Sequence, residues 1–183
     1  MTNPNLMNLF SGWDGYHKSL VNAISPLTHD QLTYRLSPES KSVGEIAAHI
    51  AFGRLDWFNR MGAEGATELA IEAEPFILTY GAVKPQITEN VEEIVGWLEK
   101  SWAMIEANLT RWTVENLFET YEFSYLEDTY AISRQWTIWR VMAHDIQHGG
   151  QLTVLLGAQG VELPELGDNG GHIIEPAKVG AAR

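Results

Sequence analysis

The chain has 183 residues, 45% of them hydrophobic, with a net charge of −12 and no cysteine. A chain of this length and apolar content is expected to build one domain around a full hydrophobic core. The acidic balance argues against general binding to nucleic-acid phosphates or anionic membrane surfaces, and the missing thiols exclude disulfides and thiolate metal sites. The sequence shows neither a signal-peptide pattern nor an apolar run of the roughly 20 residues that span a membrane. We therefore expect a cytoplasmic protein.

The first helix is predicted from the periodicity of its apolar residues. These recur at steps of three and four from Leu6 to Ile24, and Pro26 closes the pattern. Thr28 follows, with Gln31 three residues later, which is the spacing of a capping box. The sequence therefore predicts a long amphipathic helix and then a short helical turn.

The second helix has a clear beginning. Ser42 is a suitable cap, Glu45 occupies the reciprocal position of a capping box, and apolar residues follow on one side, which predicts a helix to about Met61. Residues 62–87 contain several glycines and prolines and are interpreted as a long connection with at most one short helical turn. A connection of this length inside a domain is uncommon and often shapes a site.

A third helix is expected to begin near Thr88, because apolar residues from Val91 to Leu109 form a stripe at helical spacing while the intervening glutamates stay solvated. The stretch from Leu117 to Ile132 alternates aromatic and polar residues. This alternation is typical of extended backbone and indicates a small hairpin.

The fourth helix is expected to begin at Ser133 and to end near Gly157 or Gly160, either of which suits a left-handed cap. The fold class predicted from these elements is all-α, a four-helix bundle with a long connection between helices 2 and 3 and a small hairpin before helix 4. We assign residues 1–160 to the bundle and residues 161–183, rich in glycine and proline, to a C-terminal loop or tail.

Two histidines near the end of the chain have the spacing of metal ligands. His144 and His148 are four residues apart, which on a helix corresponds to about 6 Å and just over one turn, so both rings project from the same face. Two nitrogens so placed can converge on one ion. Taken alone, the pair is also common on helix surfaces and in ordinary cores.

A third histidine strengthens the metal interpretation. His49 falls on the buried side of the second helix, one turn after Ile46 and one turn before Gly53. Facing positions on different helices of a bundle meet in its core, where metal sites are often built. The alternative is that the buried imidazole hydrogen-bonds a backbone carbonyl or an acidic side chain. Spacing alone leaves both open.

Three imidazoles would leave at least one metal position for water or substrate, as in catalytic zinc sites, and both zinc and nickel suit such ligands. Asp145 stands where the metalloproteases with an H-E-x-x-H motif have glutamate, and it is too short for that role. We expect it either to orient an imidazole or, more simply, to be a solvated surface carboxylate. Gln151 lies close to the histidine face and is a candidate to contact a ligand or to bridge helices.

The remaining histidines do not fit the centre. His17 lies beside the apolar face of the first helix and is expected to be a partly buried packing residue. His29 lies in a turn. His172 lies in the tail and would reach the metal only if the tail folded back.

At these residues the chain resembles the DinB-like superfamily, the damage-inducible DinB and YfiT-like metalloenzymes, which are unrelated to the DNA polymerase that shares the DinB name. The resemblance lies in the capped segment Ser42–Ile50, which contains His49, and in His144-x-x-x-His148-Gly149-Gly150-Gln151-Leu152. It extends over roughly Leu6 to Gly160. The long 62–87 connection and the tail depart from the family pattern.

The resemblance implies a four-helix bundle, a zinc or nickel site on His49, His144 and His148, and a homodimer. Family members with assigned activities include transferases that use low-molecular-weight thiols such as bacillithiol or mycothiol, a maleylpyruvate isomerase and proposed metal-dependent hydrolases. Substrates do not transfer safely across such a group.

Three functions are compatible with these observations. The first is a metal-dependent transferase that joins a small thiol to an electrophilic compound in detoxification or stress response; the absence of cysteine fits a nucleophile supplied by the cosubstrate. The second is a hydrolase that uses metal-activated water. The third is a non-enzymatic protein that binds a structural metal ion or a small ligand. The sequence does not identify the substrate.

Overall fold

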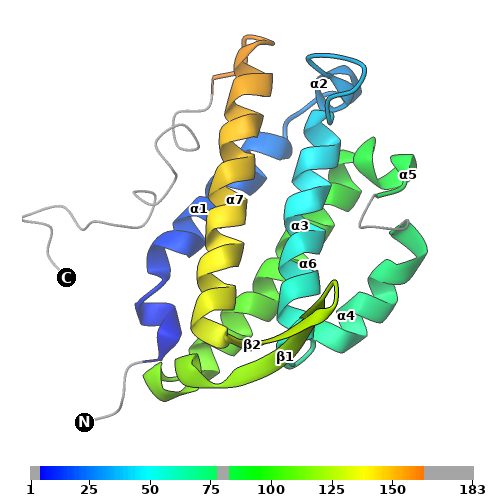
Figure 1. Cartoon of the computed structure of the whole chain (residues 1–183). Helices are drawn as coiled ribbons and strands as arrows, with labels where there is room; N and C mark the ends of the chain where they lie inside the picture. The colour runs from blue at the N-terminus through cyan, green and yellow to red at the C-terminus, as the bar shows by residue number, and fades with distance from the viewer. Residues whose placement is uncertain (1–4, 78–82, 163–183) are drawn as a thin grey trace, which may run out of the picture.

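The computed structural model describes residues 5–77 and 83–162, and this part of the chain is mostly helical. Four long helices dominate it: α1 (Ser11–Ile24), α3 (Val43–Arg60), α6 (Val91–Arg111) and α7 (Arg134–Gly157). Figure 1 shows α3 and α7 side by side, with α1 and α6 behind them. The prediction of four long helices is therefore confirmed, with a small two-stranded sheet as an addition to the helical layer.

The beginnings of these helices follow from their capping residues. Ser42 and Glu45 form the predicted capping box before α3, since the serine side chain accepts from the Glu45 backbone and the glutamate accepts from the Ser42 backbone. The side chains of Asn90 and Ser133 cap α6 and α7 by accepting from the backbone N–H groups of Glu93 and Trp136. The third helix thus begins three residues later than expected.

The N-terminal region contains two further short elements. A 3-10 turn, η1 (Leu6–Asn8), precedes α1, so the predicted first helix is interrupted around residues 9 and 10. The short helix α2 (His29–Thr33) is opened by the predicted capping box of Thr28 and Gln31. At the other end of the chain, Gly160 has a φ of +74° just after α7, in the left-handed region expected there.

The core lies where α3 meets both α6 and α7, while α1 packs on α6. Large aromatic side chains fill these contacts: Trp13 of α1 meets Trp102 of α6 edge to face at 5.4 Å, and Phe52 of α3 lies 5.0 Å from Trp97 of α6. Such pairs combine large buried area with favourable ring geometry. These contacts hold α6 against both α1 and α3, the helix that carries His49.

The connection between α3 and α6 is more helical than the sequence suggested. It contains α4 (Ala66–Ala73), the 3-10 turn η2 (Glu74–Phe76) and α5 (Pro85–Thr88), where a single short turn was expected. Two of the residues that argued for a loop stand at the beginnings of these elements, since Gly65 is the residue before α4 and Pro85 is the first residue of α5. Residues 78–82 of the connection lie outside the described part.

One glycine allows this connection to dock closely on α3. A Cβ atom at Gly44 would lie 1.8 Å from the carbonyl oxygen of Thr88, at the end of α5. Only glycine therefore permits this approach of the two backbones. The contact holds α5 against the first turn of α3.

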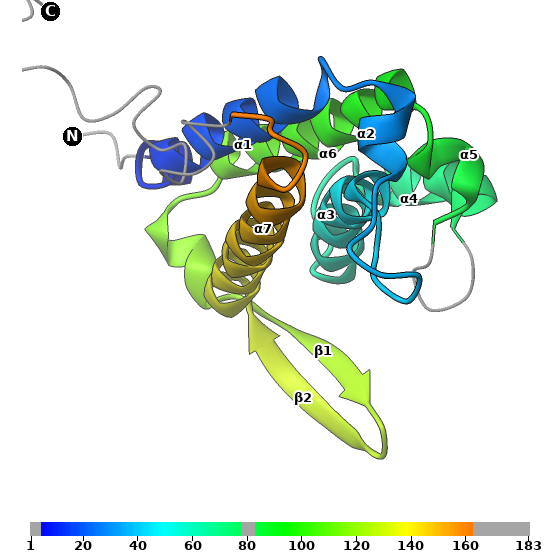
Figure 2. The same cartoon turned by 90° about the horizontal axis from the view of Figure 1, so that it is seen from above.

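The predicted hairpin is confirmed as β1 (Thr120–Tyr125) and β2 (Asp128–Ser133), an antiparallel pair in which Thr120 faces Ser133; the 3-10 turn η4 (Val114–Phe118) precedes it. Figure 2 shows the hairpin extending away from the helices. Its inner side is anchored at α3 and α7: Phe123 lies 5.5 Å from Trp57, and Tyr121 hydrogen-bonds Thr137 at 2.8 Å.

Within the residues that the structure describes, no helix combines the length and the apolar character needed to cross a membrane. The tail assigned to residues 161–183 lies outside the described residues from position 163 onward, and so does His172.

Candidate metal centre

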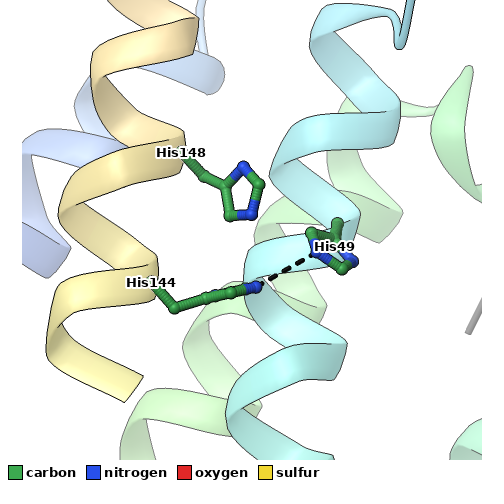
Figure 3. A group of neighbouring side chains, drawn as sticks. All are labelled: His49, His144 and His148. Carbon is green, nitrogen blue, oxygen red and sulfur yellow. Dashed lines mark hydrogen bonds between the residues drawn. The ribbon is translucent and has the colours of Figure 1, made fainter. Parts of the chain in front are cut away.

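Two neighbouring helices bring the three predicted histidines together. His49 lies on α3, and His144 and His148 lie one turn apart on α7, with all three rings directed into the space between the helices (Figure 3). The ring centroids are separated by 4.8 Å for His49 and His144, 4.7 Å for His49 and His148, and 4.3 Å for His144 and His148. The three imidazoles therefore form one half-buried cluster.

The nitrogens of this cluster are close enough to share one ion. One ring nitrogen from each histidine lies within 4.8 Å of the others, and the Nε2 atoms of His49 and His144 are 3.1 Å apart. Two facing nitrogen lone pairs repel unless a proton or a cation lies between them. Ligands at about 2.0–2.1 Å from a tetrahedral ion are about 3.4 Å apart, close to the distance between these two Nε2 atoms, so this donor set fits a divalent metal.

Gly53 is what allows α7 to approach α3 at this level. A Cβ atom at this position would lie 2.8 Å from Cε1 of His144. The His144 ring therefore packs against the bare backbone of α3, one turn after His49. This role of Gly53 was not predicted from the sequence, where it marks only the face of the helix.

Gln151 contacts one histidine of the cluster directly. Its Oε1 lies 2.7 Å from Nδ1 of His148, so Nδ1–H donates to the amide oxygen and the lone pair is left on Nε2. An imidazole that binds a metal is commonly held in its tautomer by such a bond from its other nitrogen. The predicted proximity of Gln151 to the histidines is thus observed; whether it contacts a cofactor stays a prediction.

Two of the histidines are disposed to be neutral. Burial lowers the pKa of His49 to about 4, helped by the positive charge of Lys41. Burial also lowers the pKa of His148, although its hydrogen bond to Gln151 partly opposes this. A neutral imidazole is the form that offers a lone pair to a metal.

Two cavities open beside the cluster. One, of about 540 Å³, includes His148 and Gln151 in its wall, and the other, of about 310 Å³, includes His49. Ser40 and Lys41, in the segment before α3, line both. A small molecule can therefore reach the histidines from the outside.

The sequence profile of the DinB superfamily matches residues 14–152, which contain all three histidines. The chain belongs to the DinB superfamily. Its fold is similar to the crystal structure of a DinB-like protein from Bacillus cereus ATCC 10987, with a TM-score of 0.68 over 89% of this chain and 98% of that one, at 17% sequence identity. At this identity the likeness shows the fold alone. No curated protein matches the chain.

In this DinB-superfamily protein, Asp145 is not the solvated surface carboxylate that the sequence favoured. Its side chain is fully buried and forms an ion pair with the equally buried Arg54 of α3, with Oδ2 2.8 Å from Nε. The indole of Trp13 donates to the same oxygen at 2.8 Å. The prediction was wrong because one step along a helix turns a side chain by about 100°, away from the histidine face and into the core.

Asp145 also lies behind the histidine cluster. Its second oxygen, Oδ1, has no hydrogen-bond partner and lies 4.0 Å from Nδ1 of His144. This distance is too long for a hydrogen bond, yet it places negative charge on the side of the ring opposite Nε2. The alternative considered from the sequence, that Asp145 orients an imidazole, is compatible with this arrangement.

The buried network continues through His17. This ring is buried, stacks on Trp102 at 5.1 Å between centroids, and accepts through Nδ1 from Nη1 of Arg54 at 3.3 Å. Its Nε2–H therefore faces Glu99, 3.2 Å away. The expectation of a packing residue is confirmed, with a polar role added.

Burial also raises the pKa of Tyr16, whose hydroxyl donates to the Asp145 carbonyl at 3.3 Å.

His17 should make stability depend on pH. Burial, together with the charges of Arg54 and Lys18, lowers its pKa from 6.5 to about 3. Between these values the unfolded state binds a proton that the folded state does not, so stability falls as pH drops below about 6.5. From pH 7.5 to 5.0 the contribution of this group is about 1–2 kcal/mol.

Urea unfolding of the wild type and of His17→Gln at both pH values measures this contribution. Glutamine does not titrate, so the wild type should lose more stability on acidification than the variant does. An equal loss in the two proteins would show that folding does not lower the pKa of His17.

Proposed function

We propose that His49, His144 and His148 bind one divalent ion, zinc or nickel, between α3 and α7 of a four-helix bundle, and that the protein is a metal-dependent enzyme. The observation that carries this proposal is the convergence of three imidazoles from two helices beside cavities that a small molecule can enter. Metal sites of this kind, with three protein ligands and an open position, are characteristic of catalysis.

The residues of the chain prepare the site for a metal in three ways. The lowered pKa of His49 and His148 keeps these ligands neutral, Gln151 holds the tautomer of His148, and Asp145 places a negative charge behind His144. A divalent ion bound there would supply Lewis acidity and lower the pKa of a thiol or a water in its remaining position.

Among the possible reactions, transfer of a small thiol to an electrophilic compound agrees best with the surroundings. In such a reaction a sulfur–carbon bond forms, the bond from that carbon to its leaving group breaks, and the thiol proton leaves with that group. An acidified thiol needs no separate base. Two acids near the cluster are already engaged, Asp145 with Arg54 and Glu45 with Arg35, and the chain itself contains no thiol that would compete.

One observation keeps a hydrolase as the second candidate. Glu39 lines the smaller cavity together with His49, and a carboxylate in such a place can accept a proton from an attacking water. A Glu39→Gln variant separates the two reactions, because it should abolish hydrolysis and leave thiol transfer nearly unchanged. The third candidate is a non-enzymatic stress protein that binds a metal or a small ligand. Such a protein should show neither hydrolysis nor thiol transfer.

The proposal also includes the extent of the domain, its location in the cell and its oligomeric state. We propose a bundle that spans residues 1–160, followed by a tail, which acts as a cytoplasmic homodimer. The exposed aromatic side chains of Tyr125, Trp136 and Trp139 are of the kind that a second copy would cover. Light scattering of the purified protein tests the dimer.

The function is tested by metal content and by access to the metal. Purified protein should contain one zinc or nickel per chain, and a cobalt-substituted form should change its visible spectrum when small thiols are added. Incubation with thiol and an electrophile should then give the thiol adduct. Release of product without thiol would favour the hydrolase. If chelation unfolds the protein and no thiol perturbs the cobalt spectrum, the enzymatic proposal fails.

A further inference from the structure

The larger cavity beside the histidines has an apolar wall. Ile46 of α3 and Val154 and Leu155 of α7 line it, and Leu36 closes it from the segment between α2 and α3. His148 and Gln151 lie in the same wall. Leu36 and Val154 remain 58% and 60% exposed, so this apolar surface is open to an incoming molecule.

Lys41 stands where this cavity meets the smaller one, since it lines both. Among the cationic side chains of the described residues, Lys41 differs from the rest in its lack of a partner. The others all have a partner: a carboxylate for Lys18, Lys100, Arg35, Arg54, Arg60, Arg111 and Arg134, a backbone carbonyl for Lys84, and indole rings for Arg140. Lys41 has no such hydrogen-bonded or stacked partner among the described residues, although its charge helps to lower the pKa of Glu45.

The charge of Lys41 acts directly on the histidine cluster. It contributes to the lowered pKa of both His49 and His148, so its ammonium group lies within electrostatic range of both rings. The neighbouring Arg35 does not add to this field, because Glu45 neutralises it through two hydrogen bonds of 2.6 and 2.7 Å. In a chain of net charge −12, an anion is repelled by the general field and needs a local cation to hold it.

From these observations we propose that the cavity binds a small amphiphilic anion, with its anionic group at Lys41 and a short apolar chain between Ile46, Val154 and Leu155. This assignment rests on the proposed function, since it places the remaining, reactive end of the molecule at His49, His144 and His148. It defines the substrate class as a small organic anion with an apolar portion. A neutral compound of the same shape is therefore expected to bind more weakly than the anion.

The assignment predicts how affinity depends on the ligand. Alkyl sulfonates are suitable probes because the sulfonate group is a poor ligand for divalent metals. In calorimetric titrations, affinity should rise from ethanesulfonate to butanesulfonate to hexanesulfonate, by at most about fourfold per methylene group. The uncharged hexanamide should bind more weakly than hexanesulfonate. The resonances of the Ile46 and Val154 methyl groups should shift during the titration.

Two variants measure separately what the charge of Lys41 and the apolar wall contribute to binding. Lys41→Met should weaken hexanesulfonate binding about five- to tenfold, as expected for an ion pair near a protein surface, and leave hexanamide binding unchanged. Val154→Gln changes an exposed residue, and it should reduce the gain from chain length while keeping the preference for the anion. Lys18→Met is the matched control, because it removes the same charge from a lysine that is paired with Asp14.

The experiment is run on chelator-treated protein and on protein loaded with zinc. Sulfonate binding in both forms, with the predicted effects of the variants, supports the assignment even if no metal-dependent activity is found. Equal losses in Lys41→Met and Lys18→Met, equal affinity for the three sulfonates, or no binding at all would overturn it. The proposed metal centre is judged separately by metal content.

Discussion

Replacing Arg54 by methionine is expected to lower the free energy of unfolding by about 3–5 kcal/mol, the usual cost of leaving one charge of a buried pair alone. Both partners of the Arg54–Asp145 pair have no exposed side-chain surface. Without the guanidinium, Asp145 would keep only the Trp13 indole as a hydrogen-bond donor to its side chain. Urea unfolding of chelator-treated wild type and variant measures the difference without a contribution from bound metal.

The matched control is Arg60→Met, which removes the same side chain from the same helix. Arg60 pairs with Asp56 at 2.9 Å, but both side chains are about half exposed, so its loss should cost about 1 kcal/mol or less. The double variant Arg54→Met/Asp145→Leu should be more stable than Arg54→Met, because no buried charge remains. Similar small losses in Arg54→Met and Arg60→Met would show that the buried pair adds little.

The sequence predicted the helical layer well because its determinants are local. The capping boxes at Thr28 and Ser42 and the caps at Ser133 and Gly160 are each contained within a few residues. Periodic apolar stripes decide which side of each helix is buried. The hairpin, too, was visible in the alternation of aromatic and polar residues.

The connection between α3 and α6 was predicted less well, because its structure depends on contacts that are distant in sequence. Its glycines and prolines are compatible both with a loop and with the ends of short helices. The docking of Thr88 on the backbone at Gly44 decides between them. Such a contact between two backbones leaves no pattern in either segment alone.

The histidine cluster was predictable, whereas the buried charges behind it were missed. Arg54 continues the buried series Ile46, Ile50 and Phe58 at steps of four, so it stands on the apolar stripe of α3. Asp145 stands on the stripe of α7 in the same way, four residues after Val141. One charge of each sign on two facing stripes indicates a buried ion pair. That signal is present in the sequence, at Arg54 and Asp145.

The largest effect on metal binding is expected from the histidines themselves. Substitution of His49, His144 or His148 by alanine should each reduce metal affinity by more than the roughly 10–100-fold that loss of an outer partner costs, because only two imidazoles would remain. His29→Ala is the control, since His29 lies on α2 and has no contact with the cluster. Elemental analysis and competition with a chelating dye measure the affinity. Stoichiometric metal in any one of the three variants would remove that residue from the ligand set.

A subtler variant tests the geometry without removing a ligand. Gly53→Ala would place a Cβ atom 2.8 Å from the His144 ring, so the ring must shift and metal affinity should fall at least about tenfold. Gly96→Ala on α6 is the matched control, because its Cβ would meet nothing within 4 Å and should stabilise the helix by about 0.5–1 kcal/mol with metal binding unchanged. Since α3 carries both His49 and Gly53, unchanged affinity in Gly53→Ala would mean that His144 does not need its place against α3 to bind the ion.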